Sequence, residues 1–244
     1  MHYLIHISYE GTRYSGWQRQ GNAQNTVTAK LEAVFSRLDG RPVRLDGAGR
    51  TDAGVHALDQ TATLDLQTKT GPDGILEYVN LYLPEDISVN SIEPAPDRFH
   101  ARLRAVGKIY RYEIRTAAVP DVFRRRYQWH LKKTPDADRM REAAAVLIGT
   151  HDFAAFCTAR PGNHSTVRTL RRVDISQENG TMRIEFEGDG FLYNMVRILT
   201  GTLVEIGLGE KSAEELPGIL ASRKRANAGI TAPAQGLTLV RVLY

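Results

Sequence analysis

The fold is decided by the stretch Val167-Arg-Thr-Leu-Arg-Arg-Val-Asp-Ile-Ser-Gln-Glu-Asn-Gly-Thr-Met-Arg-Ile-Glu-Phe186. Its Asn179-Gly180 dipeptide is the strongest short-range signal for a tight turn between two antiparallel strands. The residues on both sides predict strands over 167–175 and 181–186. The sequence therefore predicts a β-hairpin here, which argues against a doubly wound parallel sheet.

The same hydrophobic spacing predicts the elements around this hairpin. In the C-terminal half we expect a strand at 109–115, helices at 136–148 and from 191 to about 206, and a last strand at 236–244. In the N-terminal half we expect strands at 3–9, 62–66 and 87–92, with helices at 27–38 and 75–82. The two halves repeat one another in outline.

This order predicts an α+β fold built from two split β-α-β halves of the ferredoxin-like or RRM-like kind, with a mainly antiparallel mixed sheet. A boundary is expected near Pro94-Ala-Pro96 and the basic connector 99–107. We therefore divide the chain into residues 1–104 and 105–244. A substrate would lie in a central basic cleft between the halves.

Composition places the chain among ordinary globular proteins. It has 244 residues, of which 42% are hydrophobic and 25% charged. No apolar run approaches eighteen residues and the N-terminus has no basic segment followed by an apolar one, so we expect a cytoplasmic protein without a membrane segment. The single cysteine, Cys157, cannot form an internal disulfide, which fits a reducing compartment.

Arginine is concentrated in short groups, although the net charge is only +4. Such groups suit phosphate binding, because the guanidinium is planar and always charged, but they fit equally well a solvated face balanced by acids. The groups contain Arg98, Arg102, Arg104, Lys108, Arg111 and Arg115; Arg124, Arg125 and Arg126; Arg168, Arg171 and Arg172; and Arg223, Lys224 and Arg225.

Chemistry is most concentrated in the glycine-rich stretch 45–57, Leu-Asp-Gly-Ala-Gly-Arg-Thr-Asp-Ala-Gly-Val-His-Ala. It matches neither the P-loop nor the dinucleotide-binding pattern, and its acids and histidine lack the spacing of a calcium loop or a zinc helix. The stretch also places Arg50 close to Asp52 in the sequence, and we expect the Asp52 carboxylate to stay ionised. Three glycines would let the backbone approach another surface closely.

Aromatic residues in two further places each allow two interpretations. Trp17 and Tyr14 lie in the polar, basic segment 11–20, where they could stack on nucleic-acid bases or anchor the loop to the core. Tyr110 and Tyr112 share one face of the strand 109–115, where spacing alone favours core packing.

Six ordered motifs together resemble the TruA-type tRNA pseudouridine synthases. They are Tyr9-Glu-Gly-Thr12 with Gly16-Trp-Gln18, Gly49-Arg-Thr-Asp-Ala-Gly-Val-His-Ala57, Lys108-Ile-Tyr-Arg-Tyr112, His151-Asp-Phe153, Phe191-Leu-Tyr-Asn-Met-Val-Arg197 and Ala232-Pro-Ala-Gln-Gly-Leu237. The resemblance implies conversion of uridine to pseudouridine at positions 38, 39 and 40 of the tRNA anticodon stem-loop. It also implies a homodimer that needs no cofactor and no metal.

The resemblance further implies roles for single residues. Asp52 would be the catalytic carboxylate, acting as a nucleophile or removing a ribose proton. Arg197 would be its ion-pair partner and would lower the pKa of the carboxyl by about 1–3 units. Tyr110 would stack on the target base, Arg50 would help extrude it, and Leu237 would line the pocket.

Two other functions fit the residues less well. A non-catalytic RNA-binding module or tRNA chaperone would explain the arginines and the split β-α-β halves. A glycoside hydrolase would need a second acid near Asp52, for which only Asp46 and Asp59 are available.

Overall fold

The computed structural model describes residues 1–18, 25–158 and 165–244. These residues form two compact units, Met1–Val106 with Leu239–Tyr244, and Gly107–Thr238. We call them unit 1 and unit 2. In the described parts of the chain, no helix is long and apolar enough to cross a membrane.

Unit 1 is a split β-α-β fold, as predicted. Its chain order is β1 (His2–Tyr9), α1 (Val27–Asp39), β2 (Asp46–Gly47), β3 (His56–Asp65), α2 (Pro72–Tyr82), β4 (Ile87–Pro94) and α3 (Ala101–Arg104). Strand β1 pairs antiparallel with β3 and with β4, and β2 pairs antiparallel with β3. Residues 239–243 of β10 (Leu237–Leu243) also belong to this unit.

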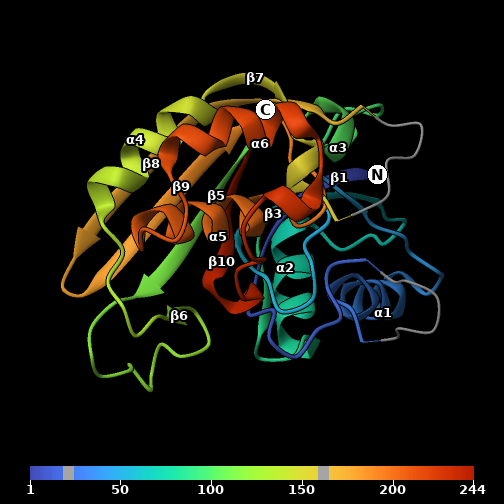
Figure 1. The fold of residues 1–244 in the computed structure, drawn as a ribbon. Coiled ribbons are helices and arrows are strands. Elements are labelled where there is room, and N and C mark those ends of the chain that lie inside the picture. Colours follow the sequence, from blue (N-terminus) through green and yellow to red (C-terminus); the bar gives the residue numbers. More distant parts are fainter. Residues whose placement is uncertain (19–24, 159–164) are drawn as a thin grey trace. The chain divides into compact units, whose positions relative to one another are not determined.

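The helices of unit 1 start and stop where side-chain chemistry dictates. Thr26 caps α1 by accepting a hydrogen bond from the Ala29 amide, and Gly40 ends the helix with a φ of 71°. The predicted apolar face of α1 is buried at Val27, Leu31 and Phe35. Helix α1 lies against α2, which packs on β4 (Figure 1).

Unit 2 is likewise built from an antiparallel sheet and helices. Its elements are β5 (Gly107–Arg115), β6 (Trp129–His130), α4 (Ala137–Leu147), β7 (Gly149–Asp152), β8 (Val167–Glu178), β9 (Thr181–Gly188), α5 (Met195–Gly207) and α6 (Leu216–Ser222). Its single-turn 3₁₀ helices are η1 (Ala154–Phe156), η2 (Ala213–Glu215), η3 (Arg225–Asn227) and η4 (Ala234–Gly236). The sheet order is β5-β9-β8-β7, all antiparallel, while β6 pairs parallel with β5. The chain is therefore α+β with mixed, mostly antiparallel pairing.

The predicted hairpin is confirmed as β8 and β9. Asn179 and Gly180 have φ angles of 51° and 70°, the two positive values that the favoured hairpin turn requires. Glu178 pairs with Thr181 directly across this turn, so β8 continues three residues past the predicted end at Ile175.

The predicted start of helix α5 at Phe191 is wrong. The helix begins at Met195, because Asn194 adopts the left-handed conformation with a φ of 61°, which interrupts a right-handed helix. Helix α5 is also buried on almost all sides rather than along one stripe. A Cβ at Gly201 would lie 2.0 Å from the Ile230 carbonyl oxygen, so only glycine at this position of α5 allows the backbone at Ile230 to pack on the helix.

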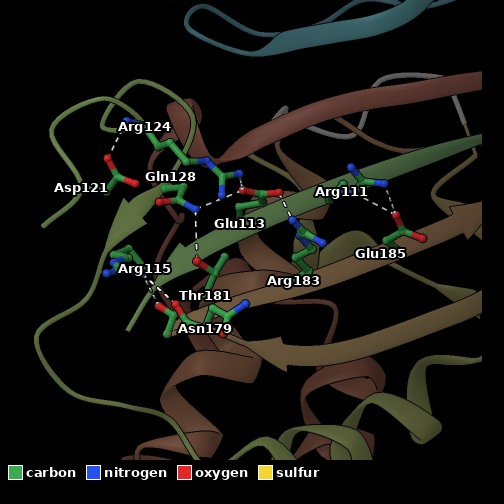
Figure 2. A network of polar contacts seen from close by, with 11 residues as sticks. Arg111, Glu113, Arg115, Asp121, Arg124, Gln128, Asn179, Thr181, Arg183 and Glu185 are labelled. Carbon is green, nitrogen blue, oxygen red and sulfur yellow. Dashed lines mark hydrogen bonds and ion pairs between the residues drawn. The ribbon is translucent and has the colours of Figure 1, made fainter. Parts of the chain in front are cut away.

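A buried carboxylate, Glu113 on β5, organises the polar side of the unit 2 sheet. Figure 2 shows Arg124 and Gln128 from the connector before α4, and Arg183 from β9, pointing at this carboxylate. Gln128 Nε2 and Arg183 Nε each lie 3.1 Å from a Glu113 oxygen. The Glu113 side chain is only 11% exposed, so its charge depends on these donors.

We expect Glu113→Gln to lower the free energy of unfolding by about 1–3 kcal/mol, because two arginines lose a buried charged partner. Glu185→Gln is the control, since Glu185 pairs with Arg111 in a more exposed position and should cost less than about 1 kcal/mol. Urea unfolding followed by circular dichroism measures both. Equal losses in the two variants would contradict a special role for Glu113.

Candidate active site

The glycine-rich stretch forms the connection between β2 and β3 in unit 1. The Ala48 amide donates to the Thr61 carbonyl at 2.9 Å, which joins the start of the connection to β3. The Val55 amide donates to the Asp52 carbonyl at 3.2 Å and closes a turn around Asp52. Asp52 is partly exposed and Arg50 is exposed. The predicted catalytic carboxylate therefore lies at a turn with access to solvent.

Buried polar side chains tie this turn to the neighbouring strands. The Tyr9 hydroxyl lies 2.7 Å from Thr51 Oγ1, and Gln60 Nε2 donates to the Gly49 carbonyl at 3.1 Å. All three side chains belong to residues at most 6% exposed. Sequence reasoning gave none of the three a role, because Tyr9 and Thr51 appeared only within the motifs that carry the resemblance, and Gln60 occupies a strand position that resembles an ordinary sheet residue.

Trp17 anchors its loop to the core and is not available for stacking on bases. It is 3% exposed, and its amide donates to the Thr51 carbonyl at 3.1 Å. A Cβ at Gly47 would lie 2.4 Å from the Trp17 indole nitrogen, so this glycine of the stretch permits the indole to pack there. Tyr14 is also buried, and its hydroxyl donates to Asp86. The end of this segment, Arg19 and Gln20, lies outside the described residues.

Unit 2 carries the other predicted site residues. Tyr110 on β5 is 7% exposed and meets Phe191 edge to face, with ring centroids 5.1 Å apart. Leu237, the first residue of β10, is 5% exposed and follows η4 directly. Tyr112, which follows Tyr110 on the same face of the strand, donates from its hydroxyl to the Pro233 carbonyl at 2.7 Å.

Arg197, in the first turn of α5, is tied to the segment that precedes β10. Its Nε donates to the Ala232 carbonyl at 2.7 Å and its Nη1 donates to Asn194 Oδ1 at 2.8 Å. Burial raises the pKa of the Tyr112 phenol, and the positive charge of Arg197 opposes that shift. Within unit 2, Arg197, Tyr112 and the segment 232–237 therefore converge, while Arg50 and Asp52 belong to unit 1.

The arginine groups divide into two kinds. Several of their members are ion-paired with acids and fit the balanced-face interpretation: Arg111 with Glu185, Arg124 with Glu113, Arg172 with Asp174 and Glu187, and Arg223 with Asp152. Arg98, Arg102 and Arg104 are exposed and form no ion pair within the described ranges. These three arginines therefore offer charge that no acid compensates within the described ranges.

A model of the family described as tRNA pseudouridine synthase matches residues 5–103 and 143–244, well over half of the chain. The chain belongs to this family. The tRNA pseudouridine synthase A of Bacillus sp. strain KSM-64 is 44% identical over 242 residues, covering 99% of both chains. The tRNA pseudouridine synthase A of Acetivibrio thermocellus is 44% identical over 238 residues, covering 98% of this chain and 97% of the relative.

Among solved structures, the crystal structure of a Cbf5-Nop10-Gar1 complex aligns with 97% of this chain and 48% of the matched chain. The sequence identity is 9% and the TM-score 0.41, a likeness too weak to support a conclusion. In the chain described here, the two ranges that the tRNA pseudouridine synthase family model matches contain Asp52, Arg197 and Leu237. Tyr110 falls between the two ranges of the family model. The alignments with the two relatives cover 99% and 98% of this chain.

Proposed function

We propose that this chain isomerises uridine to pseudouridine in the tRNA anticodon stem-loop, at positions 38, 39 and 40. The observation that supports this most strongly is the 44% identity to a tRNA pseudouridine synthase A over 99% of both chains. The geometry of unit 1 agrees with it, because Asp52 stands at a supported, solvent-accessible turn. Isomerisation fits a site that needs only a carboxylate and a way to hold the nucleotide.

In the proposed reaction, the bond between uracil N1 and ribose C1′ breaks, the base rotates, and C5 forms a new bond to C1′. The proton on C5 is lost and N1 gains one, so atoms and electrons balance without a cofactor. Asp52 would either attack as a nucleophile or remove a ribose proton to give a glycal. In both routes its ionised form is the active one.

The remaining roles belong to the same proposal. Arg197 pairs with Asp52, Tyr110 stacks on the target base, Leu237 lines the pocket, and Arg50 takes part in extruding the base at a cost of a few kcal/mol in lost stacking. The half 1–104 carries the carboxylate, and the half 105–244 carries the tyrosine and the arginine. The enzyme acts as a cytoplasmic homodimer.

A map of pseudouridine in tRNA from cells with and without this protein tests the proposed specificity. We expect pseudouridine at positions 38, 39 and 40 to disappear without the protein and to return when the wild-type gene is restored. An unchanged map would overturn the proposed function and favour a non-catalytic RNA-binding role.

The ion-pair pattern predicts which arginines contribute to tRNA affinity. We expect Arg102→Ala and Arg104→Ala each to weaken binding and to reduce the slope of log affinity against log salt by about 0.7–0.9, the loss of one phosphate contact. Arg172→Ala is the control, since its charge is already paired with Asp174 and Glu187. Filter binding at several salt concentrations measures these slopes. A larger reduction of this slope in Arg172→Ala than in Arg102→Ala and Arg104→Ala would contradict the division of the arginines into paired and unpaired ones.

A further inference from the structure

We propose that Tyr9 and Thr51 form a positioning pair that fixes the pose of Asp52. The inference rests on the proposed function, in which Asp52 is the catalytic carboxylate. Thr51 is the residue directly before Asp52, and its hydroxyl lies 2.7 Å from the Tyr9 hydroxyl. Neither hydroxyl belongs to the chemistry proposed for the site.

Both residues of the pair are buried. Tyr9 is 4% exposed and Thr51 6%, while Gln60 on β3 is fully buried. The Gln60 side chain donates from Nε2 to the Gly49 carbonyl and accepts from the Thr61 amide at Oε1. Tyr9 and Gln60 together therefore hold the loop on the N-terminal side of Asp52 at two points, Gly49 and Thr51.

The backbone of Thr51 is fixed independently of its side chain. Its carbonyl accepts from the Trp17 amide at 3.1 Å. Gly16, with a φ of +93°, lies so close that an added Cβ would be 2.7 Å from that carbonyl oxygen. Thr51 is therefore held from two directions, by the loop that carries Trp17 and by the hydroxyl of Tyr9. This leaves the adjacent Asp52 little freedom to move.

An irregularity in the sheet brings Tyr9 into this position. Ile7 pairs with Gln60 but Tyr9 pairs with Ala57, so β3 contains one residue more than β1 between the two pairs. Such bulges commonly redirect a side chain near a functional site. Here the bulge lies immediately next to the stretch that carries Asp52.

A buried hydroxyl pair is costly unless both members are hydrogen-bonded, and a phenylalanine and a valine would fill the same space without that requirement. Burial raises the pKa of the Tyr9 phenol, so the hydroxyl stays neutral and able to donate. What the two hydroxyls provide, and an apolar pair would not, is a directional link. We infer that this link keeps the Asp52 carboxylate aligned with its substrate.

The test compares Tyr9→Phe, Thr51→Val, Thr51→Ser and the Tyr9→Phe/Thr51→Val double variant. Tritium release from tRNA labelled at uridine C5 gives kcat and KM, and thermal unfolding reports folding. We expect Tyr9→Phe and Thr51→Val each to lower kcat by about 10–100-fold with KM within about twofold, because small displacements of a reacting group are that costly. Thr51→Ser keeps the hydroxyl and should recover most of the activity, and the double variant should resemble the worse single variant.

Tyr244→Phe is the matched control, because the Tyr244 hydroxyl lies 2.6 Å from Thr61 Oγ1 and forms a second tyrosine–threonine pair in unit 1. We expect its kcat to stay near the wild-type value. The proposal is overturned if kcat of Tyr9→Phe matches this control, if Thr51→Ser is as slow as Thr51→Val, or if the two single effects multiply in the double variant. Should Tyr9→Phe fail to fold, the two Thr51 variants decide the question.

The result is distinguishable from failure of the proposed function. If wild-type protein releases no tritium, or if Asp52→Asn is as fast as the wild type, the proposed function or the role of Asp52 is wrong. If both of those controls behave as expected and only the pair variants are fast, the positioning role alone is wrong.

Discussion

Asp52→Asn is expected to slow pseudouridine formation by about 10⁴-fold or more, which corresponds to at least about 5 kcal/mol of barrier. The amide has nearly the shape of the carboxylate but can neither attack carbon nor accept a proton as a base. Because Asp52 is partly exposed at a turn, folding and tRNA affinity should be retained. Single-turnover tritium release and filter binding measure the two properties separately.

Asp46→Asn is the control for this change. Asp46 belongs to the same glycine-rich stretch but is exposed on β2, where its backbone pairs with Thr63. Its loss of charge should leave the rate within about threefold, as expected for a surface substitution away from the chemistry. A rate for Asp52→Asn that equals the Asp46→Asn rate would exclude Asp52 as the catalyst.

Arg197→Ala is expected to produce the second largest effect, a decrease in kcat of about 10²–10³-fold, as is typical when one charge-stabilising donor is removed. The arginine is held in one orientation by the Ala232 carbonyl and Asn194 Oδ1, so its guanidinium is preorganised. Arg197→Lys should recover only part of the rate, because an ammonium cannot reproduce the planar fork that makes both contacts.

Arg225→Ala separates the proposed catalytic role of Arg197 from its structural one. Arg225 also holds the segment before β10, through the Ala228 carbonyl and Thr231 Oγ1, but has no proposed role in the reaction. We expect its loss to lower thermal stability with kcat nearly unchanged. If both arginine variants lower kcat equally, Arg197 acts only by holding this segment.

The fold could be predicted to the level of its elements because local signals and burial agree. Asn179-Gly180 specified the hairpin, and hydrophobic spacing placed the helix 27–38 close to the observed bounds of α1. The start of α5 could not be predicted, since the left-handed conformation of Asn194 depends on the structure around it. Strands β2, β6 and β7 and helix α3 have at most four residues, too few to show a period.

The candidate site could be predicted only in part. The composition of the stretch around Asp52 pointed to chemistry, but the support beneath it depends on pairing between residues far apart in the sequence, such as Tyr9 and Thr51. Trp17 had two interpretations that only its burial could resolve. The arginine groups could not be divided either, because Arg111 and Glu185 become partners only when β5 pairs with β9.

The central claim is tested most directly by incubating purified protein with unmodified tRNA that carries tritium at uridine C5. Isomerisation must expel that hydrogen, so the account predicts release of one tritium for each pseudouridine formed, without any added cofactor. Tight binding of the tRNA with no release of tritium would contradict the account.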